Sequence, residues 1–305
     1  MLQFIKMETD IHFENVFTQE IQADWLQKNN VSLDVLRLDR LHEIVSGNKW
    51  FKLKYYLKDA KQKELHTIAT FGGAYSNHVI ATAFACFKEG LNSIGIIRGE
   101  EPPVLSHTLQ LAKHYGMQFE FVNRALYKDT QLIQQTFENA YWIGEGGYGN
   151  LGVKGAREIL SCSKQSDKYS HIVCAVGTGT MMAGIISAAN TNQNIIGISA
   201  MKGNHSLVQK VNELLSFSDK NKSFVIKHDF HFGGYAKYSR ELIEFMNETW
   251  QRHQLPTDIV YTAKTFYAIR QMIIAHSIPR ESTVLMIHSG GLQGNLSLPE
   301  KTLYF

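Results

Sequence analysis

The sequence has little cysteine and no long apolar run, and each shortage excludes a class of protein. Cys86, Cys162 and Cys174 are odd in number and widely spaced among 305 residues, so neither a disulfide framework nor a thiolate zinc site is expected. The thirteen histidines are scattered without a ligand motif, and we expect no metal. The apolar stretch at 79–87 is too short to span a membrane. These shortages favour a protein of the reducing cytoplasm without a membrane partner.

An excess of charge of one sign is also missing. Lysine and arginine number 31 against 28 acidic residues, and the formal net charge of +3 gives no reason to expect nucleic acid as a partner. Residues 1–15 lack the unbroken apolar stretch of a signal peptide. The composition is that of an ordinary globular protein, and the length allows one large domain or two ordinary ones.

Short β-branched segments alternate with amphipathic segments along most of the chain. In the predicted helix at 239–253, an apolar stripe with Leu242, Phe245 and Met246 lies beside charged residues, and a second helix is predicted at 104–115. The alternation predicts an α/β fold with parallel sheets covered by helices. The predicted strands are residues 66–71, 92–97, 118–122, 171–176, 194–199, 223–227, 258–261 and 283–287.

The glycine cluster at 144–149 is the candidate hinge between two lobes. We expect a large lobe of residues 1–52 and 150–305 and a small α/β lobe of residues 53–149. In open sheets of this kind, ligands bind beyond the carboxyl ends of the strands. Four loops in that position have unusual sequences, and the chemistry is expected there.

The first loop, residues 46–53, leads from polar and glycine residues into a helix, with Lys49 near the helix start. The helix dipole disfavours a cation at that end, which lowers the pKa of an amine as a nucleophilic lysine requires. From this segment alone a solvated lysine is the more frequent explanation.

The second loop, residues 70–78, lies between a predicted strand and an apolar helix. Ser76 or Asn77 can cap that helix, and free N–H groups at its start can bind a carboxylate. Capping alone explains the segment equally well.

The third loop, residues 176–184, follows a predicted strand and opens a helix, which makes it a candidate phosphate cradle. Its glycines also imitate the dinucleotide-binding pattern. That pattern needs an acidic residue after the next strand, where this chain has Met201 and Lys202. A phosphate monoester therefore fits better than a dinucleotide, and an NAD-linked oxidoreductase is disfavoured.

The fourth loop region pairs two late segments, residues 258–262 and 288–291. Both carry polar side chains at predicted strand exits. Because strands commonly end in such residues, neither segment identifies a site on its own.

Taken together and in this order, the four loops resemble the 1-aminocyclopropane-1-carboxylate (ACC) deaminase and D-cysteine desulfhydrase family. These are pyridoxal-phosphate (PLP) enzymes with a two-lobed, tryptophan-synthase-β-like fold (fold type II). The sharpest match is the run Gly47-Asn48-Lys49-Trp50-Phe51-Lys52-Leu53, where the family has G-N-K-x-x-K-L with the first lysine as Schiff base. The run Gly72-Gly73-Ala74-Tyr75-Ser76-Asn77 matches its G-G-x-x-S-N loop.

The resemblance implies the cofactor pyridoxal 5'-phosphate, a small amino-acid substrate and a homodimer. It implies that Lys49 carries the cofactor and acts in catalysis with Ser76, and that Ser76 and Asn77 approach the substrate carboxylate and the cofactor's phenolic oxygen. The further residues it assigns are the cofactor contacts Lys52, Gly177, Thr178, Gly179, Thr180, Thr262 and Ser289, the substrate contact His78, and the catalytic tyrosines Tyr235 and Tyr261.

Two residues depart from the deaminase pattern. ACC deaminases have glutamate and leucine where this chain has Thr262 and Ser289. A carboxylate keeps the pyridine nitrogen of the cofactor protonated, whereas a hydroxyl gives a weaker electron sink that suffices for eliminating a thiolate. We therefore expect a D-cysteine desulfhydrase that forms pyruvate, ammonia and hydrogen sulfide. ACC deaminase is the nearest alternative, and a PLP-binding protein without turnover is a further one.

Overall fold

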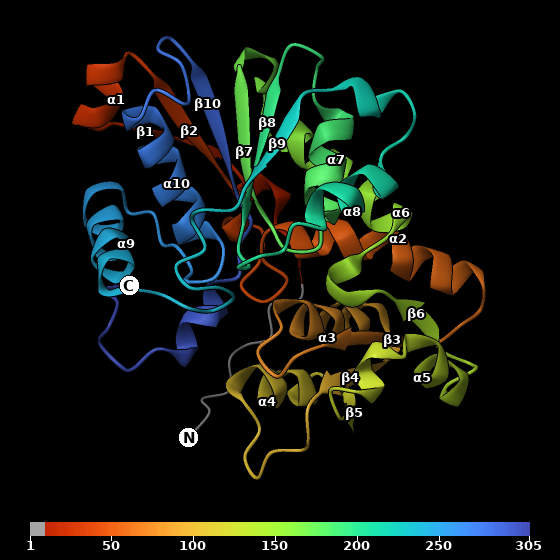
Figure 1. Ribbon diagram of the computed structural model, residues 1–305. Coiled ribbons are helices and arrows are strands. Elements are labelled where there is room, and N and C mark those ends of the chain that lie inside the picture. The colour runs from red at the N-terminus through yellow and green to blue at the C-terminus, as the bar shows by residue number, and fades with distance from the viewer. Residues whose placement is uncertain (1–9) are drawn as a thin grey trace.

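Two separate β-sheets organise the computed structural model, which describes residues 10–305 (Figure 1). Neighbouring strands are parallel except β1 and β2, which are antiparallel. The larger sheet has the order β1 (Thr18–Ile21), β2 (Ser32–Arg37), β10 (Thr283–His288), β7 (His171–Val176), β8 (Asn194–Ser199) and β9 (Phe224–Lys227). The smaller sheet has the order β5 (Gln118–Val122), β4 (Asn92–Arg98), β3 (Thr67–Gly72) and β6 (Tyr141–Ile143). Residues 1–9, part of the predicted large lobe and of the segment expected to lack a signal peptide, lie outside the described residues.

Seven of the eight predicted strands are present, with ends that agree within one residue. The prediction of a strand at 258–261 is wrong. There the Asp258 carboxylate accepts hydrogen bonds from the backbone N–H groups of residues 260–262 and curls the segment into the start of α10 (Thr262–Ile274). The prediction also missed β1, β2 and β6, of which β6 has only three residues.

The predicted helix at 239–253 is confirmed as α9 (Arg240–His253), whereas the one predicted at 104–115 is shorter. The Ser106 side chain accepts from the Leu109 N–H and caps α4 (His107–His114) at that point. The other helices are α1 (Asp24–Asn29), α2 (Asn48–Gln62), α3 (Asn77–Glu89), α5 (Thr130–Thr136), α6 (Asn150–Ala156), α7 (Thr180–Ala188) and α8 (Leu207–Leu214).

The central strands of the larger sheet are buried on both faces. Successive residues of β7 alternate between two cores, with Ile172 and Cys174 in one and Val173 in the other. Helices α2, α6, α7 and α8 contribute to the first core, and α1, α9 and α10 to the second (Figure 1). Burial on both faces is the reason that these strands are continuous apolar runs in the sequence. A third core packs α3 and α4 against the smaller sheet.

Helix α2 connects the two sheets. Phe51 packs in a core of the larger sheet, and Leu53 and Leu57 pack in the core of the smaller one. The helix runs unbroken through the lobe boundary predicted between residues 52 and 53. The division into lobes 1–52 with 150–305 and 53–149 stays a prediction. None of the helices within residues 10–305 is both long and apolar enough to cross a membrane.

The crossing of α2 and α6 depends on a glycine. A Cβ on Gly155 would lie 1.6 Å from the carbonyl oxygen of Phe51, far closer than any real contact. The two backbones therefore approach as only glycine allows. Because α2 begins at Asn48, this approach also helps to set where Lys49 lies.

We expect the substitution Gly155→Ala to destabilise the protein. Alanine favours a helix over glycine by about 1 kcal/mol, but crowding a packed contact costs about 1–3 kcal/mol, and here the contact is with rigid backbone. Thermal and urea denaturation would measure the loss.

The matched control is Gly294→Ala in the 3-10 helix Leu292–Ser297, where the nearest atom to the new Cβ, on Val260, would be 3.8 Å away. A Gly155→Ala protein at least as stable as the parent would show that the helices shift at no cost.

Candidate active site

A cavity of about 520 Å³ lies where the four loops converge. Most of the site residues predicted from the sequence line it, although they come from segments far apart in the chain. Those that line it are Lys49, Lys52, Ser76, Asn77, His78, Gly177, Thr178, Gly179, Tyr235, Tyr261 and Ser289. Thr180 and Thr262 are fully buried and do not line it.

Lys49 is held at the cavity wall by the start of α2. Gly47 has a φ of 64°, and a Cβ there would lie 1.8 Å from the carbonyl oxygen of Ser289. That same oxygen accepts from the Asn48 N–H at 3.3 Å, and the Lys49 ammonium donates to Asn48 Oδ1 at 2.8 Å. Burial lowers the pKa of Lys49 to about 8, with Asp258 opposing the shift. The amine is therefore far easier to deprotonate than that of a solvated lysine.

Lys52 lies one turn further along α2 and is not a solvated helix charge. Its side chain is buried, and its Nζ donates to the carbonyl oxygen of Gly146 at 3.0 Å. Burial and the neighbouring charge of Lys49 hold the pKa of Lys52 well below its usual range. Two basic groups thus share one wall of the cavity, an arrangement that favours an anion between them.

The start of α3 brings two buried polar atoms without partners to the cavity. Ser76 caps the helix by accepting from the N–H groups of His78 and Val79. The Thr70 hydroxyl donates to the Ile143 carbonyl and lies 2.9 Å from His78 Nε2, so this nitrogen carries the proton. Within residues 10–305, His78 Nδ1 and Asn77 Oδ1 have no hydrogen-bond partner. Such atoms are costly unless a ligand satisfies them.

The loop between β7 and α7 has the form of an anion cradle. Gly179 has a φ of 92° and precedes α7, whose first N–H groups no side chain caps. The hydroxyls of Thr178 and Thr180 lie 3.2 Å apart, so the buried Thr180 supports the residue that faces the cavity. Uncapped N–H groups at a helix start bind phosphate well, and Lys52 adds charge nearby.

Two tyrosines, Tyr235 and Tyr261, also line the cavity. The Tyr261 ring centre lies 6.0 Å from Lys49 Nζ and 6.1 Å from the ring centre of Tyr235. Burial and the proximity of Tyr235 hold the pKa of Tyr261 well above its usual range. Tyr261 therefore stays a protonated hydroxyl that can donate.

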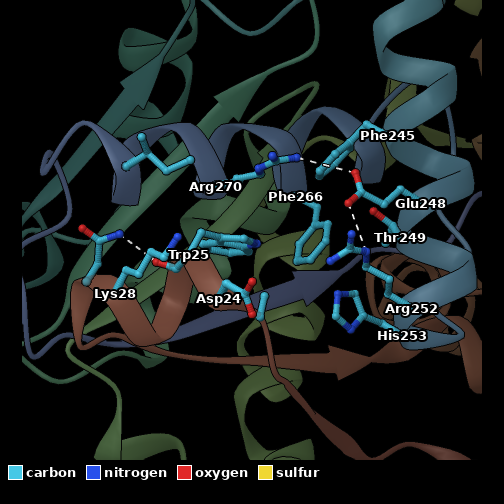
Figure 2. A pocket seen from close by; sticks show the side chains of 13 residues that line it. Asp24, Trp25, Lys28, Phe245, Glu248, Thr249, Arg252, His253, Phe266 and Arg270 are labelled. Carbon is cyan, nitrogen blue, oxygen red and sulfur yellow. Dashed lines mark hydrogen bonds and ion pairs between the residues drawn. The ribbon is translucent and has the colours of Figure 1, made fainter.

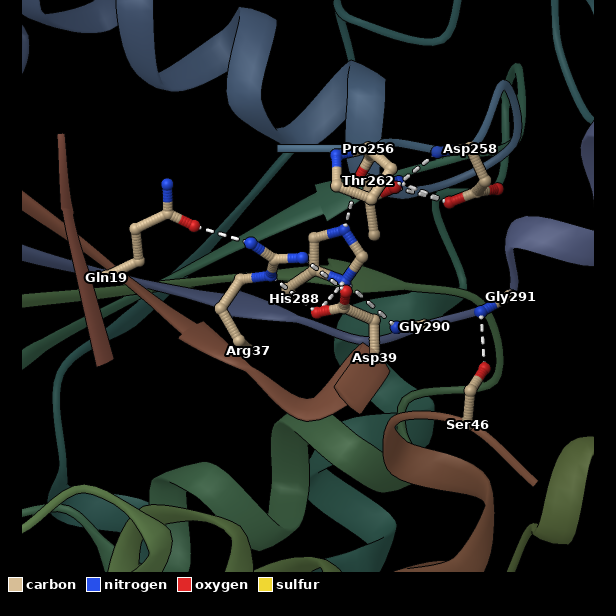
Figure 3. A network of polar contacts seen from close by, with 10 residues as sticks. All are labelled: Gln19, Arg37, Asp39, Ser46, Pro256, Asp258, Thr262, His288, Gly290 and Gly291. Atoms are coloured by element: carbon tan, nitrogen blue, oxygen red, sulfur yellow. Dashed lines mark hydrogen bonds and ion pairs between the residues drawn. The ribbon is translucent and has the colours of Figure 1, made fainter. Parts of the chain in front are cut away.

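The backbone N–H of Tyr261 donates to the buried carboxylate of Asp258, which holds Tyr261 in place. Asp258 Oδ1 accepts from the Thr262 N–H at 2.8 Å and from the Thr262 hydroxyl at 2.6 Å (Figure 3). The Thr262 hydroxyl in turn accepts from the Asp258 N–H at 2.6 Å. Thr262 thus completes a cap of α10 and does not face the cavity, whereas Ser289 does.

A network that the sequence analysis did not identify supports the end of β10 (Figure 3). Arg37 donates to both carboxylate oxygens of Asp39, at 2.8 and 2.7 Å. Asp39 lies 3.2 Å from His288 Nδ1, and His288 Nε2 donates to the Pro256 carbonyl at 2.7 Å. Burial raises the pKa of the Asp39 carboxyl, but His288 and Arg37 outweigh it and hold the pKa below its usual range. The network anchors the residue that precedes Ser289.

Several charged residues of the cavity were also not predicted from the sequence. Arg98 ends β4, so applying the strand-exit rule to every predicted strand would have found it. Glu145 lies in the predicted hinge and is the one carboxylate among the described lining residues. The others are Arg124 and Lys210. Across residues 10–305, no three His, Cys, Asp or Glu side chains gather as a metal site would require.

A second cavity, of about 420 Å³, lies between α1, α9 and α10 (Figure 2). Phe245 and Phe266 form its apolar side. Glu248 is 3.1 Å from Arg252 and 3.8 Å from Arg270, so these two arginines share one carboxylate partner. None of the predicted site residues lines this cavity, and it is separate from the candidate site.

The comparison with known families agrees with the geometry. Residues 21–290 match the family described as pyridoxal-phosphate dependent enzyme. A solved structure described as an ACC deaminase homologue has a TM-score of 0.80 at 24% identity, covering 92% of this chain and 90% of that one. Fold and site together define a pyridoxal-phosphate dependent enzyme of the tryptophan-synthase-β-like class, fold type II.

Curated relatives narrow the class. A putative ACC deaminase from Pyrococcus abyssi is 30% identical over 325 residues, which cover 99% of this chain and 94% of that protein. A bifunctional D-cysteine desulfhydrase/ACC deaminase from Arabidopsis thaliana, named as mitochondrial, is 28% identical and covers 87% of this chain and 74% of that protein. This chain belongs to the ACC deaminase and D-cysteine desulfhydrase family, as its loop motifs indicated.

The residues of the cavity fit pyridoxal phosphate. The cradle before α7 and the buried Lys52 suit a phosphate, and Lys49 offers an amine that loses its proton readily. The unpartnered polar atoms of Asn77 and His78 leave hydrogen-bonding capacity for a polar ligand.

We expect the reactivity of Lys49 to rise with pH around pH 8. Burial disfavours the ammonium, so the amine should become neutral near its pKa of about 8 and not near the ordinary value of 10.5. Brief acylation of the apoprotein at a series of pH values, quantified for the Lys49 peptide by mass spectrometry, measures this. N-acetyl-lysine amide is the reference, and a midpoint for Lys49 equal to that of the reference would contradict the prediction.

Proposed function

We propose that this chain is a D-cysteine desulfhydrase, which converts D-cysteine and water into pyruvate, ammonia and hydrogen sulfide. The observation that carries the proposal is the place of Ser289, which lines the cavity where the deaminase pattern has leucine. At the neighbouring position the deaminase glutamate is replaced by Thr262, whose hydroxyl is engaged by Asp258. We infer that Ser289, not Thr262, meets the pyridine nitrogen, which leaves that nitrogen without a carboxylate partner.

The cofactor would be held from several sides. We propose that Lys49 carries it covalently, and that Gly177, Thr178 and Gly179 bind its phosphate together with Lys52, with Thr180 supporting Thr178. When bound, pyridoxal phosphate supplies an electron sink for negative charge at the substrate Cα. Asn77 would contact its phenolic oxygen.

The remaining steps belong to side chains of this chain. Ser76 and Asn77 would hold the substrate carboxylate at the start of α3, and His78 Nδ1 would accept from the substrate. The Lys49 amine would take the Cα proton, for which its pKa of about 8 is suited. Tyr261, or Tyr235 beside it, would give a proton to the departing sulfur. Closure of the lobe 53–149 would exclude water from the cavity.

ACC deamination is the second candidate. It is favoured by the names of the relatives, since the Pyrococcus abyssi protein is named a putative ACC deaminase and the Arabidopsis thaliana protein carries both activities in its name. The proposed roles of Lys49 and the phosphate cradle are the same for both reactions. A homodimer stays a prediction.

We expect the purified protein to absorb visible light as a PLP enzyme and to release sulfide and pyruvate from D-cysteine faster than from L-cysteine. ACC should give little 2-oxobutanoate. Borohydride reduction should fix the cofactor mass onto the peptide with Lys49, and Lys49→Arg should abolish both the fixation and the turnover because an arginine cannot form the link.

The possible outcomes separate the candidates. Fixation at Lys49 with 2-oxobutanoate as the main product would overturn the desulfhydrase proposal in favour of the deaminase. Fixation without any product would leave a binding protein, and no fixation would overturn the role of Lys49.

We further expect Tyr261→Phe to lower kcat for D-cysteine by about 10²-fold with little change in KM, because a proton donor is lost while substrate contacts remain. Steady-state sulfide release measures this. Tyr238→Phe is the control, since Tyr238 is exposed and does not line the cavity. Equal kcat values for Tyr261→Phe and the parent would exclude Tyr261 as the donor.

A further inference from the structure

Lys264 is a fully buried lysine that the proposed reaction does not use. It lies in the first turn of α10, and it does not line the cavity. Its Nζ donates to the carbonyl oxygens of His231 at 2.9 Å and Gly234 at 2.8 Å. A buried ammonium needs such partners, because an unpaired charge away from water is strongly destabilising.

The two carbonyls belong to an irregular segment, residues 231–238, between β9 and α9. Four of its residues have positive φ values: Phe232 51°, Gly233 94°, Gly234 128° and Ala236 54°. Its internal backbone bonds run to the same two acceptors, from the Gly234 N–H at 3.0 Å and the Lys237 N–H at 3.2 Å. Within residues 10–305 no neighbouring strand pairs with this segment. Phe232 packs against Tyr267 and the second core, and the Lys264 ammonium ties the backbone of the segment to α10 through two hydrogen bonds.

The segment carries Tyr235, and the helix that carries Lys264 begins next to Tyr261. The two rings meet edge to face, with centres 6.1 Å apart and planes at 75°. The same helix start thus fixes Tyr261 through the Asp258 cap and Tyr235 through Lys264.

Packing alone does not require a charge at this position. A methionine has a similar length and would fill the space without the cost of removing an ammonium from water. Burial lowers the pKa of Lys264 to about 8, and Asp258 opposes the shift. Keeping Lys264 charged therefore costs desolvation free energy. The hydrogen bonds that offset this cost are those to the backbone carbonyls of residues 231–238.

We propose that Lys264 is a positioning residue that holds residues 231–238 so that Tyr235 stays against Tyr261 at the cavity. The catalytic consequence rests on the proposed function, whereas the anchoring itself does not.

The variant Lys264→Met tests the proposal, with Lys222→Met as the matched control. Lys222 also donates to a backbone carbonyl, that of Ser187 at 2.9 Å, but away from the cavity. Hydrogen exchange of peptides that cover residues 231–238, measured without substrate, should be about tenfold faster in Lys264→Met and unchanged in Lys222→Met, since local opening follows the loss of local contacts. Unchanged exchange in Lys264→Met would overturn the proposal.

Kinetics then separate positioning from general destabilisation. Lys264→Met should lower kcat by about 10-fold or more, because small displacements of a catalytic group are costly. In a Tyr235→Phe background the same change should have little further effect, because Lys264 acts through Tyr235. Full additivity of the two losses would contradict the proposal.

If Lys264→Met does not fold, Lys264→Gln carries the test, because its amide retains an N–H donor and should show a smaller rise in exchange. If the protein turns over neither D-cysteine nor ACC, hydrogen exchange alone decides whether Lys264 anchors the segment. A normal exchange pattern with active enzyme would reject the inference and leave the proposed function intact.

Discussion

The site depends on the close backbone contact between the start of α2 and the segment after β10. Gly47 approaches the carbonyl of Ser289 so closely that a Cβ would overlap it, and the Asn48 N–H donates to that oxygen. Gly291 completes the contact by donating its N–H to the Ser46 hydroxyl (Figure 3). The amine-bearing helix is thereby fastened to the carboxyl edge of the larger sheet, where ligands of open parallel sheets bind. The α2–α6 crossing at Gly155 then sets the direction of that helix.

Basic groups outnumber acidic ones among the described residues that line the cavity, where Lys49, Lys52 and Arg98 face a single carboxylate, that of Glu145. Burial and the charge of Lys49 hold the pKa of Lys52 below its usual range, and burial with the charges of both lysines does the same for the pKa of His78. Asp258 and Asp39 are buried as well, but their oxygens are occupied by Thr262, Arg37 and backbone N–H groups. The wall therefore offers an amine of lowered pKa and an anion cradle, a combination that suits a phosphorylated aldehyde cofactor.

Patterns local in the sequence were predictable, and contacts between distant segments were not. Seven strands and α9 followed from apolar periodicity, because buried strands of a parallel sheet must be apolar on both faces. The apolar run at 258–261 has the same local pattern, and only the side chain of Asp258 turns it into a helix cap. Asp39 and Lys264 meet partners far away in the chain, His288 and residues 231–234, so no local pattern predicted their roles.

The sequence by itself determined the fold class and the family, and most of the site residues that it predicted line the cavity. It could do so because glycines, caps and the lysine of the first loop are constraints on a few consecutive residues. Tertiary structure alone decided that Ser289 faces the cavity while Thr262 closes the cap of α10. It also decided that the Lys264 ammonium donates to a backbone carbonyl of residues 231–238, that of Gly234. Both outcomes depend on which hydrogen-bond partner a buried polar group meets, and that is settled only when separate elements pack together.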